Sequence, residues 1–169
     1  QLQQQVGITF LFVTHDQEEA LTLSDRIAVM SEGHVMEIAS PAQLYENPSS
    51  RFVADFIGNM NFFSGKVTSF EKGKLTISTD SIGEIKIPVP NLEYPFGSSV
   101  WIAIRPEKIK PVFSEPKNLQ NVMQGIMGPS AYLGDRSHFY VNLSKREEPV
   151  LVALQNLERS IDILSEPNQ

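Results

Sequence analysis

"ITFLFVTHDQEEALTLSDRIAVM", residues 8–30, determines the architecture of the first part of the chain. Residues 8–14 are almost all apolar, which predicts a strand with apolar side chains on both faces, as in the centre of a parallel sheet. His15 follows at the carboxyl end of that strand. Asp16 is placed to cap a helix over 17–23 whose first turn is acidic. The stretch therefore predicts the strand–loop–helix unit of an α/β layer, with an imidazole in the loop.

Residues 1–57 hold further short elements but too few strands to complete a parallel sheet. The pattern predicts a helical turn at 2–5 closed by Gly7, strands at 26–30 and 34–39 around the turn 31–33, and helices at 42–45 and 50–57. A strand that is apolar on both faces needs a neighbour along each edge. We therefore interpret residues 1–57 as a fragment of an α/β domain; pairing of the strand with a second copy of the chain is the alternative.

From residue 58 onward the pattern changes to short strands separated by turn residues. The predicted strands span 62–70, 74–78, 84–89, 100–105, 122–127, 137–143 and 150–154. Strands of this length and spacing are typical of a small β-barrel or sandwich. We therefore predict a mainly β chain with an α/β remnant, divided into residues 1–57 and residues 58–169.

The composition excludes several classes of protein and argues against one class of binding partner. The 169 residues include no cysteine, which excludes disulfides, zinc–thiolate sites and thiol catalysis. No apolar run approaches the roughly 18 residues of a membrane span, and the polar start QLQQQ is unlike a signal peptide, so we expect a soluble cytoplasmic chain. The net charge of −6 arises in residues 1–57, which hold eight acidic and two basic side chains, whereas residues 58–169 hold twelve of each. This balance argues against a nucleic-acid partner.

The position of His15 allows a functional and a structural interpretation. Ligands of parallel sheets bind at the carboxyl ends of the strands, and the N-terminus of a helix attracts anions. An imidazole at this point would hydrogen-bond a phosphate oxygen or orient an attacking water. Alternatively, His15 only closes the strand and packs in a turn. Spacing alone leaves both interpretations open.

Four stretches together resemble one family. FLFVTHDQEEALTLSDRIAVMSEG (10–33) closely resembles the switch-histidine region of ABC transporter ATPases of the importer type. SPAQLYENPSSRFVADFIGNMNFF (40–63) resembles the segment that joins this ATPase domain to an accessory C-terminal domain. AIRPEKI (103–109) and AYLGDRSHFYVNL (131–143) resemble the two signature stretches of that accessory domain, the TOBE domain, which has an oligosaccharide-binding-type (OB-like) β-barrel fold. The resemblance covers essentially the whole chain.

The resemblance implies that residues 1–57 are the C-terminal fragment of a P-loop ATPase domain and that residues 58–169 are a TOBE-type regulatory domain. His15 is then the switch histidine, which approaches the γ-phosphate of ATP and the catalytic water. ATP and Mg²⁺ are the expected cofactors of the intact protein, and no metal ligand is identified in this chain. A P-loop, G-x-x-x-x-G-K-[ST], is absent from the sequence, as are the LSGGQ signature and the acidic strand that holds Mg²⁺. The fragment alone is therefore predicted to be inactive.

The implied partners are a second copy of the subunit and the permease subunits of an importer, at the inner face of the cell membrane. On overall resemblance, which includes VALQNLER (152–159), the transporter is most similar to the putrescine/spermidine group. Sugar, iron and sulfate importers share most of the motifs and remain alternatives. A rival of another class is a free-standing sensing module, in which residues 58–169 bind a small-molecule regulator at the OB-like domain.

The remaining candidate residues are predicted to be mainly structural. They are His34 in a hairpin turn, His138 in a strand, the aromatic residues Phe62, Phe63 and Phe70, Arg105 in the RPE motif, and Gly134, Asp135 and Arg136 in the LGDR turn. The LGDR turn is predicted to be structural because glycine and aspartate are common in tight turns. For Arg105 and the LGDR turn, a ligand-binding role is the alternative.

Overall fold

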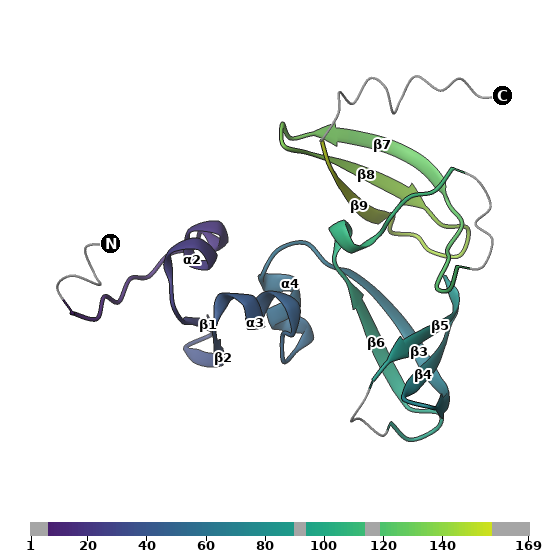
Figure 1. The fold of residues 1–169 in the computed structure, drawn as a ribbon, viewed down its shortest axis with the longest axis horizontal. Helices are drawn as coiled ribbons and strands as arrows, with labels where there is room; N and C mark the ends of the chain where they lie inside the picture. The colour runs from purple at the N-terminus through teal and green to yellow at the C-terminus, as the bar shows by residue number, and fades with distance from the viewer. Residues whose placement is uncertain (1–6, 90–93, 114–118, 157–169) are drawn as a thin grey trace. The chain divides into compact units, whose positions relative to one another are not determined.

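The computed structural model describes residues 7–89, 94–113 and 119–156 of the chain. It divides into two compact units, Gln1–Gly58 (unit 1) and Asn59–Gln169 (unit 2). Figure 1 shows short helices and one hairpin in unit 1, and two sheets in unit 2.

Unit 1 consists of short elements in the predicted order: α2 (Gln17–Leu23), β1 (Ile27–Ser31), β2 (His34–Ala39), α3 (Pro41–Glu46) and α4 (Arg51–Phe56). The helix predicted over 17–23 is confirmed. The hairpin and the two later helices are also confirmed, and their observed ends differ from the predicted ends by about one residue or less. Glu32 and Gly33 turn the hairpin with φ of 49° and 79°. Two consecutive positive φ values are typical of the type I′ turn, whose twist matches that of paired strands.

The core of unit 1 is small and comes from the hairpin and the two later helices. Its buried members are Val29, Ala39, Leu44, Val53 and Ile57. Ser40 and Ser50 cap α3 and α4, each accepting a hydrogen bond from a backbone amide in the first turn of its helix. Local capping and a few apolar contacts therefore hold these short helices in place.

The strand predicted at 8–14 is wrong for the described chain. This segment has no regular secondary structure, and Leu11 and Val13 are 94% and 96% exposed. A strand needs a partner for its backbone N–H and C=O groups, and no described residue of this chain pairs with the segment. The helical turn predicted at 2–5 lies outside the described residues.

The described residues of unit 2 form seven antiparallel strands and one 3₁₀ helix. They are β3 (Asn61–Glu71), β4 (Lys74–Thr79), β5 (Gly83–Pro88), β6 (Ser99–Ile104), η1 (Pro106–Lys108), β7 (Ile126–Tyr132), β8 (Arg136–Asn142) and β9 (Val150–Gln155). The first sheet has the order β5-β4-β3-β6 and the second has the order β7-β8-β9, and both are open. The predicted mainly β class is confirmed.

Both sheets of unit 2 contribute to one apolar core. Its buried members are Phe63, Val67, Leu75, Ile77, Ile82, Ile85 and Ile102 from the first sheet and its loops, and Phe139, Leu143, Val150 and Val152 from the second sheet and its loops. Along the strands, buried and exposed positions largely alternate, as expected when one face of each sheet packs inward. Unit 2 therefore closes a core from its own residues.

Two polar side chains join the sheets of unit 2. Asn61 on β3 is 3% exposed; its amide nitrogen donates to the Leu151 carbonyl at 2.8 Å, and its amide oxygen accepts from the Leu151 N–H at 2.8 Å. The Arg146 guanidinium donates to the Phe62 carbonyl at 2.8 Å and lies 4.7 Å from the centre of the Phe63 ring. The Asn61 side chain thus links β3 of the first sheet to β9 of the second sheet.

Strand β7 corrects the prediction of a strand at 122–127. The observed strand begins at Ile126 and continues through Gly128 and Pro129 to Tyr132. The register with β8 shifts between Met127 and Ser130. A proline is tolerated in a strand at an edge or a bulge, and β7 is an edge strand. The predicted strand therefore both began and ended too early in the chain.

Candidate functional site

The loop that carries His15 is held by the start of α2. The Asp16 carboxylate accepts hydrogen bonds from the backbone amides of Glu18 at 2.9 Å and Glu19 at 3.1 Å. These bonds confirm Asp16 as the predicted N-cap of the helix. An N-cap of this kind satisfies amides that have no partner within the helix.

A second set of bonds fixes the residue on the other side of His15. The Thr14 hydroxyl accepts from the Asp16 amide at 3.0 Å and donates to the Glu19 carboxylate at 3.0 Å. Thr14 and Asp16 are therefore both anchored to the first turn of α2. The His15 side chain is exposed, and its ring makes no hydrogen bond among the described residues. The loop thus presents an imidazole to solvent from an ordered turn.

The anion site predicted at the start of α2 is not supported. The helix has seven residues, and the amides of Glu18 and Glu19 already donate to Asp16. The same first turn carries two glutamates, whose charge disfavours a nearby anion. The imidazole of His15, rather than the helix terminus, is therefore the group in this loop that remains available to a ligand.

Gln17 connects the histidine loop to a distant part of unit 1. Its side-chain oxygen accepts a hydrogen bond from the Gly58 amide at 2.8 Å, across 41 residues of sequence. From the same helix, Leu21 packs against the core of unit 1. No local pattern in the sequence marks a contact over such a separation.

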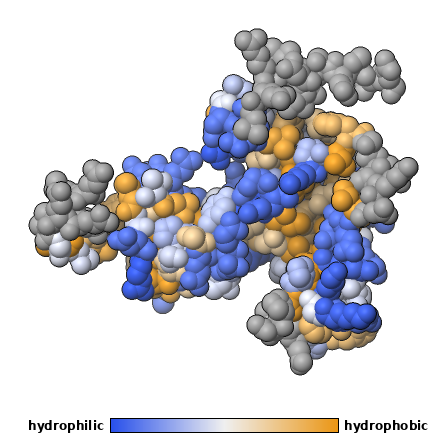
Figure 2. Space-filling view, in the orientation of Figure 1, coloured by the Kyte–Doolittle hydropathy of each residue, from blue (hydrophilic) through white to orange (hydrophobic). Residues whose placement is uncertain are grey.

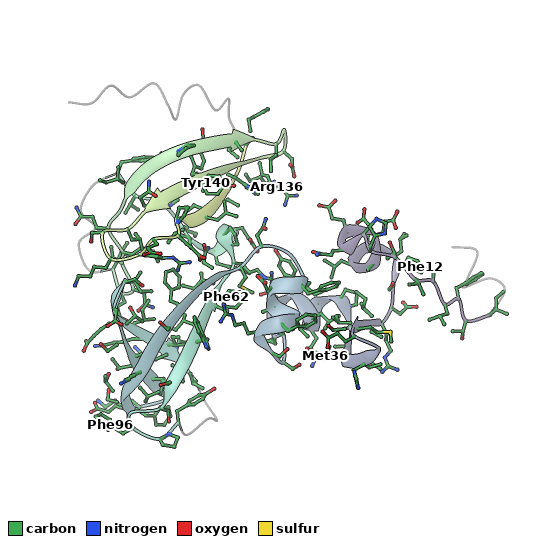
Figure 3. The ribbon with its side chains drawn as sticks, turned by 180° about the vertical axis from the view of Figure 1, so that it is seen from behind. Phe12, Met36, Phe62, Phe96, Arg136 and Tyr140 are labelled. Carbon is green, nitrogen blue, oxygen red and sulfur yellow. The ribbon has the colours of Figure 1, made fainter. Side chains whose placement is uncertain are left out.

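Two segments of unit 1 carry exposed apolar side chains. These side chains are Ile8, Phe10, Leu11, Phe12 and Val13 before the loop, and Met30, Val35, Met36 and Ile38 on the hairpin. Figure 2 shows apolar side chains interspersed on this surface, and Figure 3 labels Phe12 and Met36 on the two segments. A protein surface with this many large exposed apolar residues is typical of an interface.

The RPE and LGDR motifs have structural roles in unit 2. Arg105 is 5% exposed, and its guanidinium donates to the Asn59 carbonyl at 3.2 Å. Gly134 has a φ of 88°, and its carbonyl accepts from the Asn156 side chain at 2.9 Å. The Asn156 amide donates to the Asp135 carbonyl at 2.9 Å. Burial and turn geometry thus give both motifs a structural role.

Asp135 forms an ion pair with its neighbour. The Arg136 guanidinium lies 3.0 Å from the Asp135 carboxylate. The hydrogen bond from Arg136 is the main cause that lowers the pKa of Asp135 below its usual value of 3.8. Because both side chains are exposed, solvent screens the pair and it contributes little to folding stability.

The other candidates are partly as predicted. His34 is an exposed turn residue whose ring contacts the Glu32 carbonyl, and His138 is partly buried in β8. Phe63 is a core residue, whereas Phe70 is 39% exposed and lies outside the buried core. Within the described ranges, no group of three or more His, Asp or Glu side chains is arranged to hold a metal ion. No helix among these ranges is long and apolar enough to cross a membrane.

Comparison with known proteins identifies relatives over most of the chain. Residues 102–164 match the family model of the TOBE domain. The chain is similar to the spermidine/putrescine import ATP-binding protein PotA of Fusobacterium nucleatum, with 46% identity over 148 residues, 85% of this chain and 39% of that protein. The chain is also similar to the protein of the same name from Trichodesmium erythraeum, with 40% identity over 96% of this chain and 44% of that protein. The protein of that name from Rubrobacter xylanophilus is 46% identical over 82% of this chain and 36% of that protein. The chain spans less than half the length of these curated relatives.

Proposed function

We propose that this chain, which corresponds to the C-terminal part of a PotA-type ABC ATPase, is the regulatory end of the ATP-hydrolysing subunit of a polyamine importer. The observation that carries the proposal is the 40–46% identity, over 82–96% of the chain, to proteins named for spermidine/putrescine import. In the intact subunit, ATP hydrolysis would drive uptake through permease subunits at the inner face of the membrane. A second copy of the subunit is the expected partner.

His15 is assigned the role of the switch histidine. Its ring is exposed on an ordered turn, so both ring nitrogens are accessible to a phosphate oxygen and to a water. A neutral imidazole has one donor and one acceptor, which suits a group that contacts the phosphate and orients the water. Thr14 and Asp16 hold the loop at the first turn of α2. In the intact subunit, bound ATP would supply the transferable phosphoryl group, and bound Mg²⁺ would neutralise its charge.

The chain by itself is assigned no ATPase activity. The phosphates of ATP require a P-loop, and the 169 residues contain no such sequence. We assign the P-loop to the part of the subunit that lies outside this chain, since the relatives are more than twice as long. The exposed apolar residues around the histidine loop, Leu11 and Val13 among them, would pack against that part of the ATPase domain.

The two parts of the chain are assigned different roles. Residues 1–57 are proposed as the end of the ATPase domain, and residues 58–169 as the TOBE-type regulatory domain. The TOBE match begins at residue 102, within β6, and includes the second sheet. Strands β3, β4 and β5 precede the match but share its core, which supports one domain from residue 58 onward.

The test uses the intact subunit with His15→Ala. We expect ATP hydrolysis to fall about 100-fold or more, as for other residues that orient a nucleophile, while the Kd for ATP changes by about threefold or less. His34→Ala is the matched control, because His34 is an exposed histidine in a hairpin turn. Hydrolysis at the wild-type rate in His15→Ala would contradict the assigned role.

The substrate class is tested separately by uptake. In cells that carry the intact subunit with its permease, loss of the subunit should abolish import of labelled spermidine and putrescine. Sugar uptake serves as the control. Normal polyamine uptake together with lost sugar uptake would replace the polyamine assignment with a sugar importer.

A further inference from the structure

Two consecutive residues at the unit boundary are each held by a side chain of their own unit. Gly58 ends unit 1, and its amide donates to the Gln17 side-chain oxygen at 2.8 Å. Asn59 begins unit 2, and its carbonyl accepts from the Arg105 guanidinium at 3.2 Å. The junction is therefore anchored on both sides of the same peptide bond.

The anchor in unit 1 leads directly to the histidine loop. Gln17 is the first residue of α2 and lies two positions after His15. Gly58 follows the end of α4, where Ile57 is buried in the core of unit 1. The amide after a helix end commonly bonds back to a carbonyl of its own helix. Here the Gly58 amide is instead bonded to Gln17 on another helix.

The anchor in unit 2 leads directly to that unit's core. Arg105 is 5% exposed and lies between β6 and η1. Two residues beyond Asn59, the buried Asn61 binds both backbone groups of Leu151 on β9. From Asn59 onward the chain is therefore fixed to unit 2. Gly58, the last residue of unit 1, has a φ of 79°, a conformation that glycine adopts without strain.

We propose that Gln17 is a positioning residue that couples the His15 loop to the start of unit 2. A change at His15 moves the first turn of α2, and the bond to Gly58 transfers that movement to the junction. Because Arg105 binds the carbonyl of Asn59, the movement at the junction then displaces Arg105, which is buried in unit 2. The inference rests on the proposed role of His15 at ATP, because only then does the loop have two states to report. It adds a route from the nucleotide to the TOBE-type domain.

The experiment compares Gln17 variants in the intact subunit. Gln17→Met keeps the length and helix propensity of the side chain but removes the oxygen that accepts from Gly58. Gln17→Asn keeps an amide that is one methylene too short, and provides a second disrupting variant if Gln17→Met folds poorly. Gln17→Glu keeps an acceptor oxygen at the same reach and should restore the bond. Gln43→Met makes the same replacement at an exposed position in the first turn of α3 and is the matched control.

The readout is hydrogen exchange of the backbone over residues 57–63 with a non-hydrolysable ATP analogue and with ADP, both with Mg²⁺. In the wild type we expect the two exchange rates to differ about fivefold, the lower end of usual allosteric couplings. Gln17→Met and Gln17→Asn should lose this difference while their Kd for the analogue stays within about threefold of the wild type, as expected when only the coupling is removed. Gln17→Glu and Gln43→Met should keep the difference.

Two outcomes would overturn the coupling. One is a nucleotide-dependent difference that persists in both Gln17→Met and Gln17→Asn; the other is a wild type without any difference. If His15→Ala still abolishes hydrolysis in either case, the proposed function stands and only the coupling fails. If His15→Ala hydrolyses ATP at the wild-type rate, the proposed function itself fails.

Discussion

The two units differ in how much of their apolar surface they bury. Unit 2 encloses eleven buried apolar residues from both of its sheets and adds the Asn61 and Arg146 links. Among its described residues, unit 1 buries six apolar residues and leaves Leu11 and Val13 almost fully exposed. Burial of apolar surface is the main favourable contribution to folding. The difference indicates that unit 2 buries its apolar surface within its own core, whereas unit 1 leaves large apolar side chains exposed.

The largest effect is expected in the core of unit 2. Phe63→Ala removes a ring that is 1% exposed and should lower the free energy of unfolding of unit 2 by about 4 kcal/mol. Denaturant unfolding, followed by the single tryptophan, Trp101, measures the loss. Phe96→Ala is the control, because Phe96 is 82% exposed. Equal losses in the two variants would contradict a self-contained core.

The next effect distinguishes this chain from the intact subunit. Val13→Asp should change the stability of this chain by less than about 0.5 kcal/mol, since the side chain meets only solvent here. In the intact subunit, the same change should cost about 3 kcal/mol, because it would bury an unpaired carboxylate. Thermal unfolding of both proteins checks this. A similar small change in both would show that the segment stays exposed.

A smaller effect is expected for the polar link between the sheets. Asn61→Leu removes both hydrogen bonds to Leu151 and leaves its backbone N–H and C=O without that partner. The cost should be about 2 kcal/mol of the free energy of unfolding, the usual range for unsatisfied buried groups. Asn142→Leu, on an exposed position of β8, is the control. No loss of stability in Asn61→Leu would mean that the core alone holds the sheets together.

The smallest effect concerns the pH dependence of Asp135. Its folded-state pKa is lowered by Arg136, so the folded chain binds this proton less readily than the unfolded chain does. The stabilisation is present above the unfolded pKa of 3.8 and is lost as pH falls through the lower folded pKa. An NMR titration of the carboxyl carbon should give a midpoint below 3.8 that rises in Arg136→Gln. An unchanged midpoint in that variant would remove Arg136 as the cause.

Prediction from the sequence succeeded where a structure depends on neighbouring residues. The cap at Asp16 and the turn at Glu32 and Gly33 involve groups within four positions of one another. It failed at residues 8–14, where the apolar pattern was compatible with a strand but the described chain offers no partner strand. It also failed at β7, where an edge position allows Pro129 inside a strand. Those outcomes depend on which strands come to lie beside the segment.

The local elements of this protein, its mainly β class and the position of His15 at the start of α2 can be read from the amino-acid sequence alone. Capping, turn formation and strand alternation arise from residues that are close in the chain. The tertiary structure decided which polar side chains link distant segments. Gln17 meets Gly58 across 41 residues and Asn61 meets Leu151 across 90, and Arg105 is buried at the junction. A polar side chain binds a distant backbone group only where packing brings the two together and excludes water, and that placement depends on the whole fold.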